Sequence, residues 1–536
     1  MSKTNAGSHS NHKFSQVPNA EIPRSKFDRS CGYKTTFDSG FLVPVFLDEA
    51  LPGDTFNCHM TAFARLATPI FPFMDNMFMD TFFFAVPYRL VWDNWQKFNG
   101  EQRNPGDSTS FLVPVLDKTK APLNAAGFPA NSISDYFGLP TLTPGIAPVS
   151  LWHRAYNLIW NEWFRDENLQ QSVTVPVTDG PDDPALFTLL RRGKRHDYFT
   201  SALPWPQKGP AVSIPLSGNA PIVSPSPTTP LVLQRTSGTA MTNGAISYDA
   251  STNKFYPATG GSATTGPMRY ESGLQADLSA VTAATINALR QAFQIQKLYE
   301  RDARGGTRYT EIIRAHFGVT SPDARLQRPE YLGGGSTPIN INPIAQTSAV
   351  PSQPSPLGNL AAMGTASVHN HGFTKSFTEH TLIIGLVSVR ADLSYQQGLD
   401  RMFSRSTRFD FYWPALSHIG EQAVLNQEIY CQGSANPTQD AAVFGYQERY
   451  AEYRYKPSKI TGQFRSNFPQ TLDAWHLAQK FTALPTLSSA FIQENPPVAR
   501  VIAVPTEPQF LFDSYFKNIT ARPMPVYSVP GYIDHF

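Results

Sequence analysis

Phe56-Asn-Cys-His-Met-Thr-Ala-Phe-Ala-Arg65 is a run in which apolar side chains stand at every second position. This period of two is typical of a β-strand with one buried face. Only Phe63 breaks the polar side of the pattern. The apolar side consists of Phe56, Cys58, Met60, Ala62 and Ala64, and the polar side of Asn57, His59, Thr61 and Arg65. The run therefore predicts a half-buried strand.

Further strand patterns lie on both sides of this run and again near the end of the chain. Residues 81–86 and 382–389 are short, continuously apolar runs, which suit strands that are buried on both faces. Pro87 ends the first of them. Near the C-terminus Phe510, Phe512, Ser514 and Phe516 alternate with Leu511, Asp513, Tyr515 and Lys517. Strands thus cluster in residues 41–88 and from residue 375 onward.

The region between the two strand clusters contains helical patterns. Apolar residues at helical spacing predict one amphipathic helix at 151–163 and another near Ile286, Leu289 and Phe293. Tyr309, Ile312, Ile313, His316 and Phe317 predict a third helix, and Gly318 supplies its C-cap. If the two strand clusters share one sheet system, the helices belong to insertions. This organisation predicts a mainly β protein, an antiparallel jelly roll with very long loop insertions that contain several helices.

The composition suits a chain whose surface meets other protein. Charged residues are 16% of the 536, below the roughly 25% of ordinary soluble domains. Aromatic residues are 12%, and 46 prolines favour irregular loops and β-structure over a helical bundle. The net charge of +2 predicts that any nucleic-acid site is a local patch.

Cysteine usage and targeting signals bear on the compartment. Cys31, Cys58 and Cys431 are odd in number and far apart, which favours a reducing cytosol over a disulfide framework. Residues 1–30 have no apolar core, and no apolar run is long enough to span a bilayer. We therefore expect a protein made in the cytosol, without membrane insertion.

Two segments stand apart in composition. Residues 1–30 are rich in Ser and Asn and weakly basic, which predicts a mobile arm that either touches nucleic acid or is a frayed terminus. Residues 216–275 are dominated by Ser, Thr, Gly, Ala and Pro and show almost no periodicity. Within them Ile246, Tyr248, Phe255 and Tyr256 suggest a hairpin of short strands.

Motifs of catalysis are missing from the sequence. It holds no GxSxG, HExxH, Walker or GxGxxG pattern, so we expect no enzyme, no catalytic residue and no cofactor. Gly333, Gly334 and Gly335 predict a flexible turn rather than a phosphate cradle. His369, His371 and His380 lie close together, but no cysteine or carboxylate cluster accompanies them, so we expect no metal site.

Two basic features remain. Arg191, Arg192, Lys194 and Arg195 form a compact cluster that is either a contact to packaged DNA or a solvated face. Residues 449–456 combine cations with Tyr450, Tyr453 and Tyr455. This combination is used both for single-stranded nucleic acid and at subunit interfaces, and we favour the interface.

The last segment of the sequence is Arg522-Pro-Met-Pro-Val-Tyr-Ser-Val-Pro-Gly-Tyr-Ile-Asp-His-Phe536. Such a segment stays ordered only when it packs on its own domain or on another copy. With Arg154-Ala-Tyr-Asn-Leu-Ile-Trp-Asn-Glu-Trp-Phe-Arg165 and Ala451-Glu-Tyr-Arg-Tyr-Lys-Pro457, it resembles the major capsid protein of the Microviridae, within them the gokushovirus type. The resemblance runs from about Ser30 to the C-terminus, apart from the 216–275 insert.

The resemblance implies a single eight-stranded jelly-roll domain over residues 31–536 that self-assembles through pentamers into a T=1 icosahedral shell of sixty copies. The shell would enclose circular single-stranded DNA, with an internal scaffolding protein, a small basic DNA-binding protein and a pilot protein as partners. The implied location is the virion, assembled in the bacterial host cytoplasm. Expected subunit-interface residues are Tyr450, Tyr453, Arg454, Tyr455, Lys456, Tyr527, Tyr532 and Phe536.

For the 216–275 insert, the resemblance implies a surface protrusion at the three-fold axes that contacts a host surface receptor. Ile246, Tyr248, Phe255 and Tyr256 would pack there. Two alternatives stay open: a phage adhesin without a shell-forming role, and an enzyme on a β-sandwich. An adhesin would usually show repeats or a heptad segment, and neither is visible.

Overall fold

The computed structural model describes residues 23–209, 286–347 and 357–527, together with the backbone of short strands between residues 222 and 276. The chain divides into two compact units. Met1–Lys208 and Asp302–Phe536 form the first, which we call the body. Gly209–Arg301 form the second, which we call the insertion unit. Each unit is described by itself.

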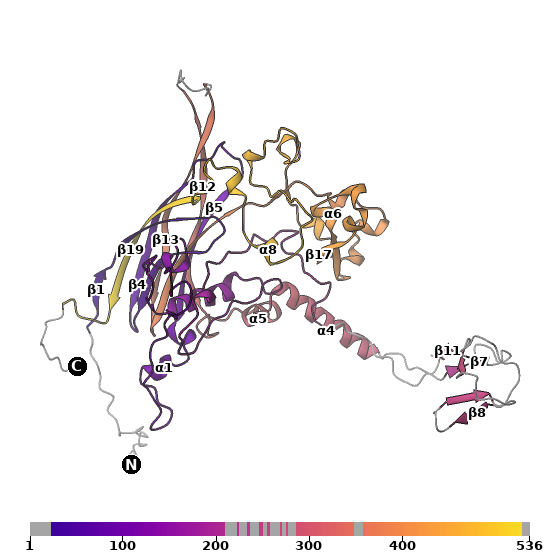
Figure 1. Cartoon of the computed structure of the whole chain (residues 1–536), viewed down its shortest axis with the longest axis horizontal. Helices are drawn as coiled ribbons and strands as arrows, with labels where there is room; N and C mark the ends of the chain where they lie inside the picture. The colour runs from indigo at the N-terminus through magenta and orange to yellow at the C-terminus, as the bar shows by residue number, and fades with distance from the viewer. Residues whose placement is uncertain are drawn as a thin grey trace, which may run out of the picture. The chain divides into compact units, whose positions relative to one another are not determined.

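The body is built on a nine-stranded antiparallel sheet in the order β1-β19-β4-β13-β12-β5-β14-β3, with β2 also paired to β19 (Figure 1). The strands are β1 (Ser25–Asp28), β2 (Cys31–Phe37), β3 (Val43–Ala50), β4 (Thr55–Leu66), β5 (Met77–Pro87), β12 (Glu330–Ala345), β13 (Leu360–Ser376), β14 (Thr381–Ala391) and β19 (Phe510–Arg522). Ser25–Asp28, which lie within the predicted basic arm, form β1, and the mobile arm stays a prediction.

The sheet folds into two facing layers. The first layer has the order β2-β19-β4-β13, and the second has the order β3-β14-β5-β12. Asn340–Ala345 of β12 pair with Leu360–Thr365 of β13, which joins the layers at one end. Apart from the short β1, which also pairs with β19, eight strands lie in two layers between which the chain repeatedly crosses, and this arrangement is a jelly roll. The predicted fold class is confirmed.

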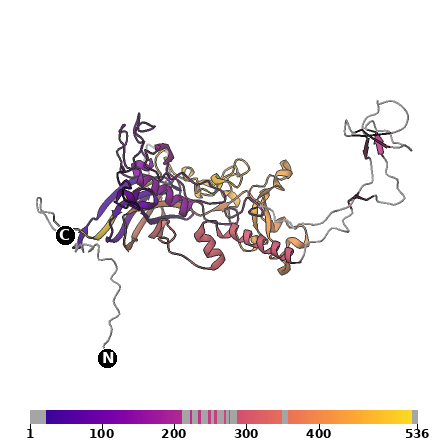
Figure 2. The same ribbon diagram turned by 90° about the horizontal axis from the view of Figure 1, so that it is seen from below.

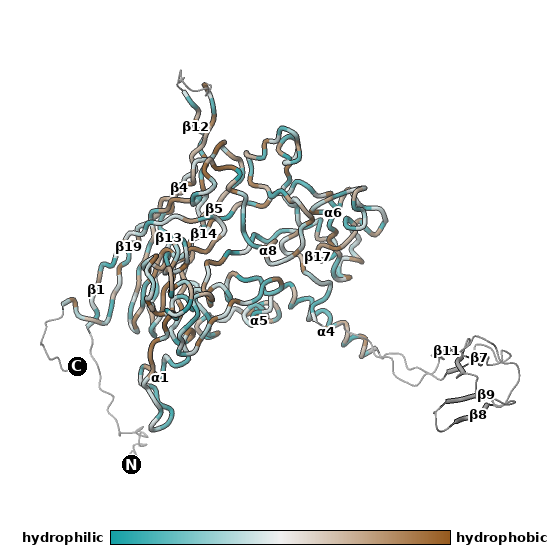
Figure 3. The backbone as a smooth tube through the Cα atoms, in the orientation of Figure 1, coloured by the Kyte–Doolittle hydropathy of each residue, from teal (hydrophilic) through white to brown (hydrophobic). Residues whose placement is uncertain are grey.

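The core fills the space between the layers. The apolar side of β4, from Phe56 to Ala64, is buried as its alternation predicts. Aromatic rings meet across the layers: Phe46 of β3 lies 4.8 Å from Phe516 of β19, and Phe83 of β5 lies 5.4 Å from Phe373 of β13, centroid to centroid. Figure 3 shows hydrophobic positions along these strands.

The second layer is covered on its other face as well. Every residue of β14 is buried, with Ile383 and Val387 in the interlayer core and Ile384 in a second core. The insertion after β5 supplies the cover through α3 (Leu151–Ile159) and a π-helical turn, η2 (Trp160–Phe164). The predicted central strand at 382–389 and the predicted helix at 151–163 are thus confirmed. The shorter helices of this insertion are η1 (Tyr88–Leu90), α1 (Trp95–Phe98), α2 (Ile133–Tyr136) and η3 (Pro184–Leu186).

The long connection from β14 to β19 forms a third cluster, built around Val424, Phe444 and Phe491 with Phe199 from the β5 insertion. Figures 1 and 2 place this orange part of the chain beside the sheet. Its elements are β15 (Ser394–Tyr395), η5 (Arg401–Phe403), η6 (Arg408–Asp410), η7 (Pro414–Leu416), β16 (Glu421–Leu425), α6 (Asn426–Ile429), η8 (Gly433–Ala435), α7 (Pro437–Asp440), β17 (Val443–Glu448), η9 (Ala451–Tyr453), β18 (Ser458–Lys459), η10 (Gly462–Phe464), η11 (Asp473–Trp475), α8 (Ser489–Ile492) and η12 (Val498–Arg500).

The other two predicted helices are also present. They are α4 (Ile286–Gly305) and α5 (Tyr309–Phe317), and Gly318 ends α5 with a φ of 69°, in the left-handed region that suits glycine. In the insertion unit the backbone forms β6 (Ile222–Val223), β7 (Leu233–Arg235), β8 (Ile246–Asp249), β9 (Lys254–Pro257), β10 (Met268–Tyr270) and β11 (Gln275–Ala276). The predicted hairpin is confirmed in the antiparallel pairing of β8 with β9.

The three glycines at 333–335 were predicted to form a turn, and that prediction is wrong. They lie inside β12, next to a bulge in its pairing with β5. A Cβ at Gly333 would stand 2.5 Å from the carbonyl oxygen of Gly372, and one at Gly334 would stand 2.0 Å from that of Thr81. The glycines are needed because neighbouring strands pass too close for a side chain.

Candidate functional site

In the basic cluster at 191–195, Lys194 is buried in the body and the Arg192 side chain is 16% exposed. Arg192 Nη1 lies 2.6 Å from Asp80 Oδ2, an oxygen that Arg390 Nε also contacts at 2.6 Å. The Lys194 side chain is 9% exposed, and its ammonium lies 4.5 Å from the centre of the Phe491 ring. These cations are part of the interior, and the solvated-face alternative is wrong for both.

Burial sets the protonation of this interior cluster. Loss of water lowers the pKa of Lys194 to about 8, against the smaller opposing effect of Glu494. The same loss of water raises the pKa of Glu494, while Lys194, Arg192 and Arg390 partly offset it. Acids and cations therefore neutralise one another inside the body. The sequence did not reveal this, because Asp80 and Glu494 lie far from the cluster in the chain.

The remaining two cations differ in exposure. Arg191 lies over the Phe41 ring at 3.9 Å and donates through Nη1 to the carbonyl oxygens of Ser39 and Glu494. Half of the Arg195 side chain is exposed, and Nη1 contacts Asp392 Oδ1 at 3.2 Å. Contact with packaged DNA stays a prediction, and within the cluster Arg195 is the residue with the exposure to make it.

The 449–456 segment contributes to an exposed aromatic surface, which we define as Phe411, Tyr412, Trp413 and Tyr453. Each of these side chains is roughly half exposed. The rings of Tyr412 and Tyr453 lie 6.1 Å apart. Tyr455 and the cations Arg454 and Lys456 are exposed nearby in the sequence, and Arg454 forms an ion pair with Glu448.

Arginines hold the aromatic surface in place. The Arg405 guanidinium lies 5.3 Å from the Phe411 ring centre and 4.4 Å from that of Tyr453. Arg408 lies 4.6 Å from the centre of the Trp413 ring, whose Nε1 donates to the Arg408 carbonyl oxygen. A rigid cluster of exposed Trp, Tyr and Arg has the composition of an interaction hot spot. Residues 405–413 were missed by the sequence reasoning, although Arg408-Phe-Asp-Phe-Tyr-Trp413 carries the same aromatic signal.

Tyr450, predicted to take part in an interface, is an internal residue. Its side chain is 2% exposed, and its hydroxyl donates to the carbonyl oxygen of Phe409 at 3.1 Å. Arg449 Nη2 donates to the same oxygen at 2.7 Å. Tyr450 therefore fixes the loop that presents the aromatic surface.

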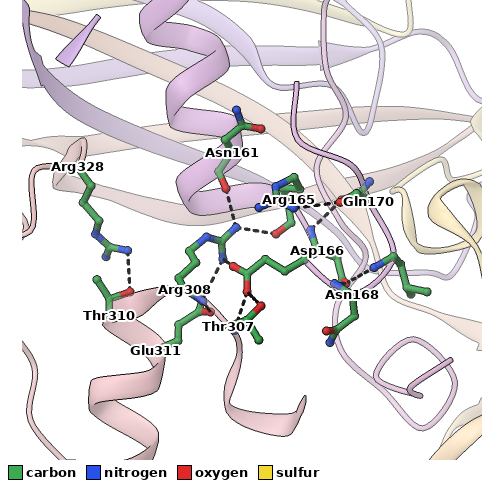
Figure 4. A network of polar contacts seen from close by, with 12 residues as sticks. Asn161, Arg165, Asp166, Asn168, Gln170, Thr307, Arg308, Thr310, Glu311 and Arg328 are labelled. Carbon is green, nitrogen blue, oxygen red and sulfur yellow. Dashed lines mark hydrogen bonds and ion pairs between the residues drawn. The ribbon is translucent and has the colours of Figure 1, made fainter. Parts of the chain in front are cut away.

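A polar network fixes the place where the chain returns from the insertion unit (Figure 4). Arg308 Nη2 donates to the carbonyl oxygens of Asn161 at 2.7 Å and Arg165 at 2.8 Å, at the end of η2. Its Nη1 lies 2.8 Å from Glu167 Oε1. The other oxygen of Glu167 accepts from the backbone N and the hydroxyl of Thr307, both at 2.7 Å.

The segment after η2 also fixes the place where the chain leaves the body. Lys208 Nζ donates to Asn168 Oδ1 at 2.8 Å. Asn168 follows Glu167 directly, so one short segment binds both the outgoing and the returning chain. The base of the insertion is thus part of the body.

Comparison with known proteins decides the family. The family model described as "Capsid protein (F protein)" matches residues 15–532. The chain belongs to this capsid-protein family. It is 50% identical over 542 residues to the capsid protein VP1 of Bdellovibrio phage phiMH2K, covering 98% of this chain and 99% of that protein. It is 45% identical over 588 residues to VP1 of Chlamydia phage 1, covering 97% of each, and 38% identical over 555 residues to VP1 of Spiroplasma virus 4, covering 99% of each.

The resemblance to gokushovirus-type capsid proteins of the Microviridae is therefore confirmed. Capsid proteins are structural, so this protein is a virion component that takes part in a shell. Within the described part of the chain, no helix is long and apolar enough to cross a membrane.

Two of the histidines considered for a metal site, His371 and His380, have different partners. His371 shares a 2.8 Å hydrogen bond between Nδ1 and Thr81 Oγ1, and the His380 ring stands edge-on to Trp95 at 5.4 Å. Among the described residues, no group of three or more His, Cys, Asp or Glu side chains could hold a metal ion. The three cysteines are free thiols.

Several predicted sites of the capsid protein lie outside the described residues. Tyr532 and Phe536 do, as do the side chains of Ile246, Tyr248, Phe255 and Tyr256. Tyr527 is described, and its side chain is 86% exposed. Their roles in interfaces and in a protrusion stay predictions.

Proposed function

We propose that this capsid protein assembles through pentamers into a T=1 icosahedral shell of sixty copies that encloses circular single-stranded DNA in the host cytoplasm. Family membership supports the shell. The observation that carries the mode of association is the rigid aromatic surface at Phe411–Trp413 and Tyr453. Aromatic and arginine side chains held exposed in one conformation lose little entropy on binding.

The contact that we propose is heterologous, so the aromatic surface of one copy meets a different surface of the next. Heterologous contacts close into rings when the rotation between subunits divides the circle. Tyr455, Lys456, Tyr527, Tyr532 and Phe536 are proposed to contribute to contacts between copies. Scaffolding, DNA-binding and pilot proteins are the proposed partners of assembly.

Residues 216–275, which lie within the insertion unit, are proposed to form the three-fold protrusion and to contact a host receptor. Both ends of the insertion are fixed within the body, by Lys208 and by Arg308, which supports the proposal that the body keeps its fold without residues 216–275. Loops on a rigid scaffold are also where binding specificity usually lies.

Electron microscopy of the protein co-expressed with its scaffolding protein tests the shell. Closed shells are expected, whereas elongated trimers would support the adhesin alternative and isolated globules would contradict both.

In a variant with residues 216–275 replaced by a short Gly/Ser turn, shells should form but fail to adsorb to cells. A variant that never assembles would place the insert in the scaffold.

A further inference from the structure

A hairpin extends one end of the sandwich beyond the rest of the sheet (Figure 1). β12 pairs with β5 up to Ile339, and from Asn340 to Ala345 it pairs with Leu360–Thr365 of β13. Among the described residues, no strand is paired to the outer edge of Asn340–Ala345. A two-stranded ribbon is at most marginally stable by itself in water. The hairpin would therefore gain stability from a further contact.

Two loops from distant parts of the chain lie beside the base of this hairpin. Ala362 N donates to the carbonyl oxygen of Pro69 at 3.3 Å, and Ile70 N donates to that of Val501 at 2.8 Å. The loop between β4 and β5 and the loop before β19 thus meet the hairpin at one end of the sandwich. We call this place the neutral end and define it as residues 66–74, 340–347, 357–365 and 501–506.

The neutral end carries apolar side chains but no charge. Its four segments contain no Asp, Glu, Lys or Arg, although such residues make up 16% of the chain. Large apolar side chains are nevertheless exposed there: Ile344 is 49%, Leu357 64% and Val504 51% exposed. Depletion of charge is the mark of the centre of a contact between proteins. The fold gathers these segments, which are far apart in the sequence, into one surface of that kind.

We propose that the neutral end packs against a second copy of the protein in the shell. The proposal rests on the proposed function, because a neighbouring copy is present only where subunits assemble. Side chains make the contact rather than a shared sheet. Ala362 N donates away from β12, so Pro343, which stands opposite Ala362, turns its nitrogen to the outer edge. That nitrogen has no hydrogen, so the edge is a poor partner for another strand.

Two other partners fit this surface less well. Nucleic acid is held mainly through its phosphates, and the neutral end has no cation to contact them. A host receptor would meet the surface only after the virion has been released. Until then the exposed apolar side chains would promote association of virions, since large apolar patches in water do so. A neighbouring copy covers them from assembly onward.

A charge placed on the hairpin tests the contact. Ile344→Asp changes an exposed side chain, so thermal unfolding of the free subunit should stay parental. In the shell the carboxylate would be buried without a partner, so association measured by analytical sedimentation should weaken at least about a hundredfold. Ile344→Leu keeps the position apolar and should associate as the parent does. Leu112→Asp is the matched control, because it adds the same charge at an exposed leucine outside the neutral end.

Hydrogen–deuterium exchange tests the same contact without a variant. The amides of Asn340–Ala345 should exchange more slowly in parental shells than in free parental subunits, because a neighbouring copy excludes water from them. Equal exchange in both would overturn the proposal, and so would parental association of Ile344→Asp. Shells of Ile344→Asp that form normally but fail to adsorb to cells would also overturn it, since the partner would then lie on the host. Each of these failures leaves closed shells in place, whereas failure of the proposed function would leave the parent without shells.

Discussion

Arg154 carries its charge into the interior of the capsid protein. Its side chain is fully buried on α3 and forms two contacts with Asp182, Nε to Oδ2 at 2.6 Å and Nη2 to Oδ1 at 2.8 Å. Nη1 donates to the carbonyl oxygen of Val91. The pair ties three parts of the β5 insertion together. Arg154 belongs to one of the motifs that carried the family resemblance, and its role is structural.

Removal of one partner from this pair should be costly. In Asp182→Ala the buried guanidinium loses its counter-charge, so the free energy of unfolding should fall by about 3–5 kcal/mol. Urea unfolding of the full-length subunit measures it. Asp183→Ala, next along the chain, is the matched control, because Asp183 pairs at the surface with Lys120 and should change the midpoint little. Equal effects of the two changes would contradict the argument.

His153 on the same helix predicts a dependence of stability on pH. Complete burial lowers its pKa to about 3, and the nearby Asp182 only partly offsets this. The unfolded chain therefore binds a proton below pH 6.5 that the folded chain excludes, and this stability is lost as the pH falls from about 6.5 to about 3. At pH 5 the loss should be about 2 kcal/mol.

The variant His153→Gln isolates this effect. Glutamine can still bond to Ser134, the partner of His153 Nε2 at 2.9 Å, but it does not titrate. Unfolding free energies of parent and variant at pH 7 and pH 5 give the test. The free energy of unfolding of the parent minus that of the variant should be about 2 kcal/mol smaller at pH 5 than at pH 7. An equal difference at both pH values would mean that protonation of His153 does not destabilise the folded protein in acid.

At the scale of elements, the network around Arg308 makes the base of the insertion part of the body. Arg308→Ala removes the donor to two carbonyl oxygens at the end of η2. It also removes a positive charge that offsets the carboxylate of Glu167. The free energy of local opening of α5 should fall by about 1–3 kcal/mol. Hydrogen–deuterium exchange of the α5 amides measures this opening.

Arg314→Ala supplies the control for this prediction. Arg314 lies on the same helix but is exposed, so its loss should leave the exchange of α5 unchanged. Exchange in β14 should be parental in both variants, because β14 belongs to a different core. Faster exchange throughout the sheet in Arg308→Ala would show that the network supports the whole body.

At the scale of the whole molecule, the aromatic surface should decide whether subunits associate. Phe411→Ser combined with Tyr453→Ser removes two exposed rings of the kind that each contribute about 2 kcal/mol or more at a hot spot. The loss is repeated at every contact of the shell, so assembly should fail while thermal unfolding of the subunit stays parental. Analytical sedimentation reports the assembly.

Leu112→Ser is the control for assembly. Leu112 is also a large exposed apolar residue, but it lies outside the aromatic surface, and isolated exposed residues of this kind carry little binding energy. Its variant should form shells. Normal shells from the double variant would place the subunit contact elsewhere on the molecule.

Local periodicity determined the elements. The alternation from Phe56 to Arg65 and again from Phe510 to Lys517 predicted β4 and β19, since a strand with one buried face needs apolar residues at every second position. The apolar run at 382–389 predicted β14, and the spacing from Tyr309 to Phe317 predicted α5 with its glycine cap. The position of the strands at both ends of the chain indicated the jelly roll.

Long-range packing decided the rest. A row of four cations does not reveal that Asp80 and Glu494 will meet it inside the protein, nor do three glycines reveal that Gly372 and Thr81 will press against them. Tyr450 and Tyr453 are alike in sequence, yet only the fold buries one and exposes the other. Pairing, burial and exposure depend on residues that are distant in the chain. The sequence therefore determined the strongly periodic strands and helices, because their pattern is local. The tertiary structure decided the strand at Gly333–Gly335 and the burial of the charges and rings whose partners are distant in the chain.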